Sequence, residues 1–295
     1  MKSKILKEEV DVFDKCKSLA SQGNIIEQYN LGLMYQDGIG VLKDVEQAAE
    51  WYRKAAGQGD ANAQYNLGWM YENGEGVLKD DKQAAEWYRK AADQGDAGAQ
   101  YNLGLMYENG EGVLKDGKQA VEWHRKAADQ GHVESQFSLA LIYDDYDESA
   151  LKDFKEAVEW YRKAANQGHV ESQFFLAGMY QFGRGVLKDD KQAAEWYRKA
   201  ADQGDAGAQF SLALMYDTGT GVLTDWRIAA EWYRKAADQG DADAQYRLGW
   251  MYQEGMGVSQ DLPMSEYWIK KAYKNPCASD SIKEASKSAL NEMEF

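Results

Sequence analysis

Histidine, cysteine and proline are scarce in this 295-residue sequence. The scarcity of each residue type argues against particular classes of site or fold. The three histidines and two cysteines form no H-E-x-x-H or C-x-x-C pattern, and no P-loop or G-x-S-x-G is present. Cys16 and Cys277 lie near opposite ends, which argues against a disulfide framework and favours a reducing compartment. We therefore predict a protein that is not an enzyme, with no cofactor and no metal ion, and keep an enzyme only as a remote alternative.

Long apolar runs and an excess of positive charge are also missing. No run approaches the roughly 18 apolar residues that span a bilayer, and the first ten residues lack the apolar core of a signal peptide. Lysine and arginine number 34 against 49 aspartates and glutamates, which gives a net charge of -15. Nucleic acid and anionic membranes are repelled by such a surface, so we predict neither as a partner. The acidity favours a partner with a basic surface or serves solubility alone, and we expect a cytoplasmic location.

Because prolines are few, long stretches of the chain can form helices. The 25 residues from Gly76 to Gln100 recur unchanged from Gly185 to Gln209. A tryptophan column repeats every 36 residues, with one interval of 37: Trp51, Trp87, Trp123, Trp160, Trp196, Trp232 and Trp268. A tyrosine column has the same spacing: Tyr35, Tyr71, Tyr107, Tyr143, Tyr180, Tyr216 and Tyr252. A fixed period of this length predicts an all-α solenoid of seven helix pairs, and we interpret both columns as packing residues.

Each repeat reads as two helices. In the second repeat, apolar residues at helical spacing predict a first helix that Gly74 and Gly76 end. Asp80 is expected to cap the second helix, with Gln83 completing a capping box. The expected buried stripe of that helix is Ala84, Trp87, Tyr88, Ala91 and Ala92. Glu86 and Lys90 are expected to pair on its solvent face. Gly68, which is replaced by alanine in later repeats, is expected to let the two helices approach closely.

The two ends differ from the repeats. Residues 4–22 predict a helix with Val12, Phe13, Cys16, Leu19 and Ala20 on one apolar face. Residues 281–293 predict another, with Ile282, Ala285, Ala289, Leu290 and Met293 facing the last repeat. We therefore divide the chain into an N-terminal capping helix (1–23), seven repeats (24–275) and a C-terminal capping helix (276–295).

The run from Ala97 to Val113, AGAQYNLGLMYENGEGV, with Ala120-Val121-Glu122-Trp123 and Ala127-Ala128 after it, resembles a Sel1-like repeat, a relative of the tetratricopeptide repeat. The resemblance covers about residues 24–275. It implies a right-handed α/α superhelix that acts as an adaptor in protein complexes, with the first helices on the concave side. Some bacterial members act as immunity proteins against antibacterial toxins. A cysteine-rich branch carries a disulfide in each repeat, and this chain lacks those cysteines.

The fourth repeat and the histidines leave alternatives open. The link after Tyr143 has no glycine and one extra residue, and its Asp144, Asp145, Asp147 and Glu148 form either a solvated acidic loop or a calcium site. His124 occupies the place of a tyrosine and is read as an aromatic substitute. His132 and His169 stand where other repeats have an N-cap aspartate. They either replace that cap or, one repeat apart, share a metal ion or sense pH.

Candidate binding residues are those that vary on one face of the first helices, at spacing i, i+3, i+7. The positions are Asn30, Leu33, Asp37; Asn66, Trp69, Asn73; Asn102, Leu105, Asn109; Ser138, Leu141, Asp145; Phe175, Gly178, Phe182; Ser211, Leu214, Thr218; and Arg247, Trp250, Glu254. One interpretation places the leucines in the core between repeats. The other makes this face a groove whose anchors include large aromatics and arginine. We predict the partner-binding residues Asn66, Trp69, Asn73, Asn102, Phe175, Phe182, Arg247 and Trp250.

The sequence thus predicts a non-catalytic scaffold that binds a protein or peptide with a basic surface on its concave face. The alternative is an immunity protein that neutralises an antibacterial toxin. Neither the partner nor the oligomeric state follows from the sequence.

Overall fold

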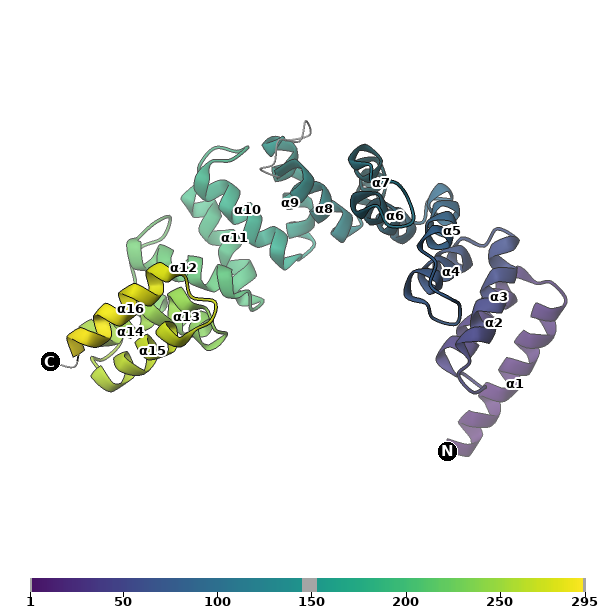
Figure 1. The fold of residues 1–295 in the computed structure, drawn as a ribbon, viewed down its shortest axis with the longest axis horizontal. Coiled ribbons are helices and arrows are strands. Elements are labelled where there is room, and N and C mark those ends of the chain that lie inside the picture. Colours follow the sequence, from purple (N-terminus) through teal and green to yellow (C-terminus); the bar gives the residue numbers. More distant parts are fainter. Residues whose placement is uncertain (1, 145–152, 294–295) are drawn as a thin grey trace. The chain divides into compact units, whose positions relative to one another are not determined.

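The computed structural model describes residues 2–144 and 153–293, and within those ranges the chain forms sixteen α-helices and no strand (Figure 1). The first helices of the repeats are α2 (Ile25–Asp37), α4 (Ala61–Asn73), α6 (Ala97–Asn109), α8 (Val133–Asp144), α10 (Val170–Phe182), α12 (Ala206–Thr218) and α14 (Ala242–Glu254). The second helices are α3 (Val45–Gly57), α5 (Asp81–Asp93), α7 (Gly117–Asp129), α9 (Phe154–Asn166), α11 (Asp190–Asp202), α13 (Trp226–Asp238) and α15 (Leu262–Lys274). The chain begins with α1 (Lys2–Ser21) and ends with α16 (Asp280–Met293).

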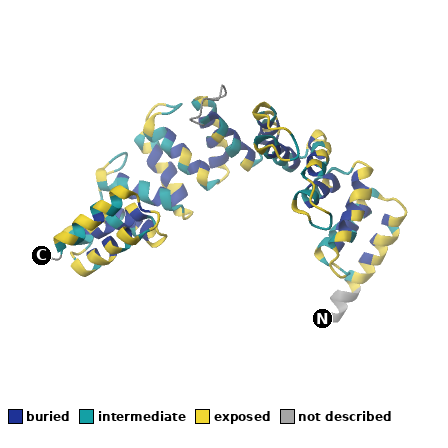
Figure 2. Cartoon of the chain, viewed as in Figure 1, coloured by how far each residue is buried: buried dark blue, intermediate teal, exposed yellow. Residues whose placement is uncertain are grey.

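Helices pack in consecutive pairs, so the predicted helix-pair solenoid is confirmed. The chain divides within α8 into two compact units, Met1–Leu139 and Ala140–Phe295. Inside each unit, a second helix packs on its own first helix and then on the first helix of the next repeat. Buried positions lie on the helix faces that meet a neighbouring helix, and exposed positions lie on the outer faces (Figure 2). The core therefore runs through each unit as a continuous seam.

The second helices begin at aspartate caps, as predicted, but without a capping box. Oδ1 of Asp80 accepts hydrogen bonds from the backbone N–H groups of Lys82 and Gln83. The Gln83 side chain does not reach back, because the N–H of Asp80 already donates to the carbonyl of Tyr71 at 2.9 Å. Instead, Nε2 of Gln83 donates to Glu86. The capping-box prediction was therefore wrong, and the first helix supplies the missing acceptor.

The glycine pair ends the first helix and contacts the preceding repeat. Gly74 has φ 69° and donates its N–H to the carbonyl of Met70, a left-handed C-cap. Gly76 also has a positive φ, and a Cβ there would lie 2.1 Å from the carbonyl oxygen of Val45. Only glycine fits such a close approach. The link thus fixes the spacing from one repeat to the next.

The second helix buries most of the predicted stripe. Ala84, Tyr88 and Ala91 are fully buried, while Trp87 is only half-buried. Gly68 faces the ring of Tyr88, and a Cβ at this position would lie 2.8 Å from the ring. The glycine therefore makes room for the tyrosine ring and not, as predicted, for a close approach of the two helix backbones. The predicted Glu86–Lys90 pair is replaced by a different contact: Nζ of Lys90 lies 3.6 Å from the centre of the Trp87 ring.

A glutamine ladder joins successive repeats, and the sequence patterns did not predict it. Gln64 is buried, and its Nε2 donates to the carbonyl of Ala56 at 3.1 Å. Nε2 of Gln94 then donates to Oε1 of Gln64 at 2.8 Å. The same pairing recurs in both units: Gln58 to Gln28, Gln130 to Gln100, Gln203 to Gln173, Gln239 to Gln209 and Asn275 to Gln245. Buried amides are thus satisfied across repeat boundaries.

Both terminal helices pack against the adjacent repeat, but not with all of the predicted residues: on α16 only Ser286 is buried, and the five predicted residues are half-buried. On α1, Phe13, Cys16 and Ala20 are buried, but Val12 is 60% exposed and does not belong to the apolar face. The reason is that α2 covers only a narrow stripe of α1. At the other end, α16 packs against α14 and α15. The boundaries of 1–23, 24–275 and 276–295 as separate parts stay a prediction.

Candidate partner-binding face

The face predicted to bind a partner is accessible along both units. Every described member of the i, i+3, i+7 set is half-buried or exposed, and none is buried. Leu33 is half-buried against the core, whereas Leu141 is 40% exposed. The leucines therefore belong partly to the core and partly to the surface. We call this set of positions the first-helix face.

In the first unit, polar groups of neighbouring repeats meet on this face. Asn66 lies within hydrogen-bonding range of Tyr29 and Tyr52, and burial raises the pKa of both tyrosines while this contact lowers it. Asn102 has the same relation to Tyr65 and Tyr88 in the next repeat. These asparagines bridge adjacent repeats as well as facing outward.

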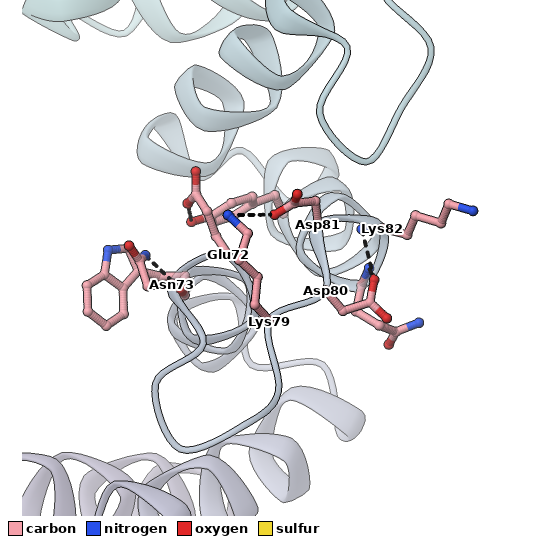
Figure 3. A network of polar contacts seen from close by, with 9 residues as sticks. Glu72, Asn73, Lys79, Asp80, Asp81 and Lys82 are labelled. Atoms are coloured by element: carbon pink, nitrogen blue, oxygen red, sulfur yellow. Dashed lines mark hydrogen bonds and ion pairs between the residues drawn. The ribbon is translucent and has the colours of Figure 1, made fainter.

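Trp69 and Asn73 lie on the same helix, α4, as Asn66. Trp69 is half-buried and packs against the cores on both sides of its repeat. Asn73 is exposed, and its Nδ2 donates to the carbonyl of Trp69 at 2.9 Å (Figure 3). The indole of Trp69 is thus partly a packing group, while Asn73 is a surface group at the end of the helix.

In the second unit, the predicted residues are aromatic and more exposed. Phe182, near the C-terminal end of α10, is 71% exposed. Phe175 is 37% exposed, and its ring stacks on that of Tyr161 at 5.5 Å with an interplanar angle of 9°. Arg247 and Trp250 are exposed on α14, two repeats further along. The eight predicted residues therefore form two sets, one in each unit, rather than one cluster.

A column of carboxylates beside this face was missed by sequence reasoning. It lies six residues after the first position of each set: Gln36, Glu72, Glu108, Asp144, Gln181, Asp217 and Gln253. The hydroxyl of the buried Tyr88 donates to Glu72 at 2.6 Å, and Tyr161 and Tyr233 donate to Asp144 and Asp217. In the first repeat Tyr52 donates to the neutral Gln36 at 2.5 Å. The fold therefore accepts glutamine at this position, and the acid in four repeats is not needed for packing.

One sequence pattern could have revealed this column: acidic residues and glutamine alternate at the same position of successive repeats. Each carboxylate is half-buried, because a ring from the second helix approaches it from the core side. The buried His124 replaces tyrosine in the third repeat, as predicted, with Nε2 3.4 Å from Glu108. The column thus presents carboxylates whose orientation the core fixes.

Charge is divided unevenly between the two helices of a repeat. The seven first helices carry two, one, one, two, one, one and two acids, ten in all, and their single basic residue is Arg247. The second helix α5 carries three acids and three basic residues. At the corner between α4 and α5, Lys79 pairs with Asp81 at 3.3 Å (Figure 3). Of the two helices in a repeat, the first is therefore the acidic one.

His132 and His169 each lie at the start of a first helix. The backbone N–H of Ser135 donates to Nδ1 of His132 at 3.3 Å, and that of Ser172 donates to Nδ1 of His169 at 3.2 Å. Both histidines therefore act as N-caps, as the simpler alternative predicted. Among the residues that the structure describes, no group of three or more metal-ligating side chains is placed to hold an ion.

The calcium alternative in the fourth repeat falls mostly outside the described residues. Asp145, Asp147 and Glu148 lie in the range 145–152, and only Asp144 is described. Asp144 ends α8 and forms an ion pair with Arg184 at 2.5 Å. In the part of the chain that the structure describes, no helix is long and apolar enough to cross a membrane.

The sequence and the fold match known proteins closely. The family model described as the Sel1 repeat matches seven segments, residues 28–60, 61–96, 97–132, 133–169, 170–205, 206–241 and 242–276. Among curated proteins, no significant match to this sequence is found.

Three solved structures illustrate the range of the likeness. A protective antigen present in uropathogenic Escherichia coli strains, displaying an SLR fold, is 34% identical with a TM-score of 0.86 over 95% of this chain. This chain spans 63% of the length of that protein. A Sel1 repeat protein from Oxalobacter formigenes is 33% identical with a TM-score of 0.66, over 85% of this chain and 99% of the other. An immunity protein from Pseudomonas aeruginosa reaches 20% identity and a TM-score of 0.38, over 79% and 82% of the two chains, too low to bear on function.

Proposed function

Because this chain belongs to the Sel1 repeat family, whose fold is typical of protein-binding scaffolds, we propose that it is a non-catalytic scaffold that captures a basic protein or peptide on its first-helix face. The observation that carries the proposal is the charge of the helices that bear this face. Ten acids and one basic residue lie on the first helices, so their field favours a partner rich in lysine and arginine.

The carboxylate column supports the same proposal. Glutamine at Gln36 and Gln181 accepts the same tyrosine hydrogen bond that Glu72 accepts. Since the fold works with either residue, the negative charge is free to serve binding. A carboxylate already held by a buried hydroxyl loses little rotamer entropy when it meets a guanidinium or ammonium group. The column is therefore preorganised for basic side chains.

Exposed aromatics would supply apolar anchors to the same partner. Phe182 and Trp250 project from first helices of the second unit, and large aromatics are common among residues that dominate binding energy. Trp69 also faces this surface, but its packing against two cores means that removing it weakens the fold. Phe182 and Trp250 are therefore the better probes of binding.

The experiment is affinity capture from the native host, identification of the partner by mass spectrometry, and titration of the purified partner. Phe182→Ala with Trp250→Ala should weaken binding at least tenfold, about 1.4 kcal/mol, and leave helicity unchanged. The control is Tyr273→Ala, an exposed aromatic residue on the second helix α15, which should bind like wild type. Unchanged affinity of the double variant would show that the aromatics are not anchors.

A toxin with a basic surface is a narrower candidate of the same class, favoured by the acidic first-helix face. Co-expression with the product of a neighbouring reading frame tests it, since an immunity protein should restore growth that the toxin alone stops. A cytoplasmic location is part of this proposal, and fractionation of the host checks it.

A further inference from the structure

Five links between helices carry a leucine that is almost completely exposed. Leu42, Leu78, Leu114, Leu187 and Leu223 are 88% to 90% exposed. Each directly follows a valine, and the first three of these valines pack against the core. The valine thus holds the link in place, while the leucine next to it contacts water. Exposed apolar side chains arranged in a regular series indicate an interaction surface.

The fold itself does not require these leucines. In the last link, Ser259 stands at the equivalent position. There the N–H of Asp261 donates to Tyr252 at 3.0 Å, just as the N–H of Asp225 donates to Tyr216 at 3.0 Å beside Leu223. The glycines agree as well, with φ 69° at Gly257 and 70° at Gly221. A polar residue therefore gives the same link, and the leucine serves something outside the repeat.

Two grooves of the second unit have the same one-repeat spacing as its leucines. One, of about 580 Å³, runs along α11 and is lined by Ala194, Arg198 and Val222 among others. A second, of about 530 Å³, runs along α13 and is lined by the equivalent Ala230, Arg234 and Val258. Val222 immediately precedes Leu223 in the chain. The first groove thus adjoins Leu223, whereas the link beside the second groove carries Ser259. Leucines and grooves each recur at the one-repeat interval.

The charge on this side of the second unit permits two copies to approach. Helix α11 carries three acids and three basic residues, and α13 carries two acids and three basic residues. The first helices, by contrast, carry ten acids against one basic residue. Two chains of net charge -15 repel each other least where the local charges cancel. The second-helix side is therefore the side on which like copies can meet.

From this arrangement we infer that the second unit carries a self-association surface, on which Leu187 and Leu223 of one copy enter the grooves along α11 and α13 of a second copy. Leucines spaced one repeat apart can all be seated only on a partner whose grooves are also one repeat apart. Another copy of this chain has grooves with that spacing. Because the leucines lie on links, and link residues also line the grooves, a two-fold arrangement seats the leucines of both copies at once and closes the assembly as a dimer.

Sedimentation equilibrium over a wide protein concentration range tests this directly. The wild type should pass from the monomer mass to the dimer mass as concentration rises. Leu187→Ser with Leu223→Ser, which copies the serine that the last link has at Ser259, should stay monomeric at concentrations where the wild type is dimeric. Circular dichroism should show unchanged helicity, since both leucines contact little within the chain. Phe182→Ser is the matched control, an exposed apolar residue on the first-helix face, and it should dimerise like wild type.

Three results would overturn the inference. The wild type could stay monomeric at every concentration, or the double leucine variant could dimerise as well as wild type. Loss of the dimer in Phe182→Ser, with the leucine variant unaffected, would place the contact on the first-helix face instead. If the double variant loses capture of a different protein while the wild type never dimerises, the leucines serve that partner and the self-association surface is wrong.

Discussion

The hydroxyl group of Tyr88 donates a hydrogen bond of 2.6 Å to Oε2 of Glu72, so a fully buried ring on α5 orients a carboxylate at the edge of α4. Burial raises the pKa of Tyr88, first of all because the charged form would lose its solvation, and the hydrogen bond to Glu72 raises it further. The hydroxyl therefore remains a donor over the whole working pH range. Other repeats have a similar link between core and surface, and its acceptor is an acid in some repeats and glutamine in others.

Removing the tyrosine hydroxyl should lower the free energy of unfolding more where the acceptor is a charged carboxylate than where it is a neutral amide. Tyr88→Phe leaves Glu72 without its partner, and we expect a loss of about 2 kcal/mol, as for a hydrogen bond to a charged group. Tyr52→Phe is the matched control, because Tyr52 is equally buried but donates to the neutral Gln36, and it should cost about 1 kcal/mol. Urea unfolding measures both. Equal losses would show that the charge of Glu72 plays no part in this contact.

The link glycines should differ sharply in their tolerance of a side chain. Gly76→Ala places a Cβ against the carbonyl of Val45 in addition to an unfavourable φ of 69°, and we expect a loss above about 3 kcal/mol. Gly95→Ala keeps only the backbone strain, since nothing lies within 4 Å of its Cβ, and should cost about 1 to 2 kcal/mol. The comparison by chemical denaturation isolates the close contact between repeats. Similar values for the two variants would contradict it.

The histidine cap of α8 should make stability depend on pH below neutrality. Burial lowers the pKa of His132 from 6.5, with Glu134 and Asp96 opposing this effect and His124 adding to it. The Nδ1 cap needs the neutral ring, and the unfolded chain takes up the proton more readily. The contribution is therefore complete above pH 6.5 and is lost as pH falls from 6.5 through the lowered pKa.

The variant His132→Asp provides the test of that dependence. Aspartate caps the equivalent helices at Asp60 and Asp96, so it should restore a cap that does not titrate in this range. The difference in unfolding free energy between wild type and variant should widen as pH drops from 7 to 5. A difference that stays constant over this interval would show that the cap is insensitive to protonation.

The glutamine ladder should contribute more through its buried member than through its exposed one. Gln64→Ala removes a buried amide and both of its hydrogen bonds, the one to the Ala56 carbonyl and the one from Gln94, which we expect to cost about 1 to 3 kcal/mol. Gln94→Ala keeps the Gln64 to Ala56 bond and removes only an exposed partner, so its cost should stay below about 1 kcal/mol. Thermal unfolding of the two variants ranks them. The reverse order would mean that the contact between repeats dominates.

Helix positions and caps were predictable from the sequence because they depend on local geometry. Asp80 and Gly74 lie where a helix must begin and end, and the structure places them there. One error came from a partner on another helix: Gln83 does not complete the capping box because Tyr71 of α4 supplies the acceptor. The other came from a competing partner on the same helix, since Lys90 covers Trp87 instead of pairing with Glu86. Spacing along one helix shows neither the distant acceptor nor which of two nearby partners is preferred.

The candidate face was predictable in outline but not in detail. The variable positions on the first helices, such as Phe182 and Trp250, are accessible as expected. The carboxylate column containing Glu72 was missed, because its meaning depends on a tyrosine 16 residues away. The exposure of Leu78 was missed for a similar reason: the leucine and the packed valine before it look alike until the fold separates them.

The central claim is that the charge of the first helices, rather than the overall acidity, selects the partner. The most direct measurement compares two triple variants with the same change in charge, using the partner captured from the host. Glu72→Gln, Glu108→Gln and Asp217→Asn neutralise the first-helix side, and Glu86→Gln, Glu122→Gln and Glu231→Gln neutralise the second-helix side. We predict that the first set weakens binding at least tenfold and reduces its salt dependence, while the second binds like wild type. Equal loss in both sets, or no loss in the first, would contradict the account.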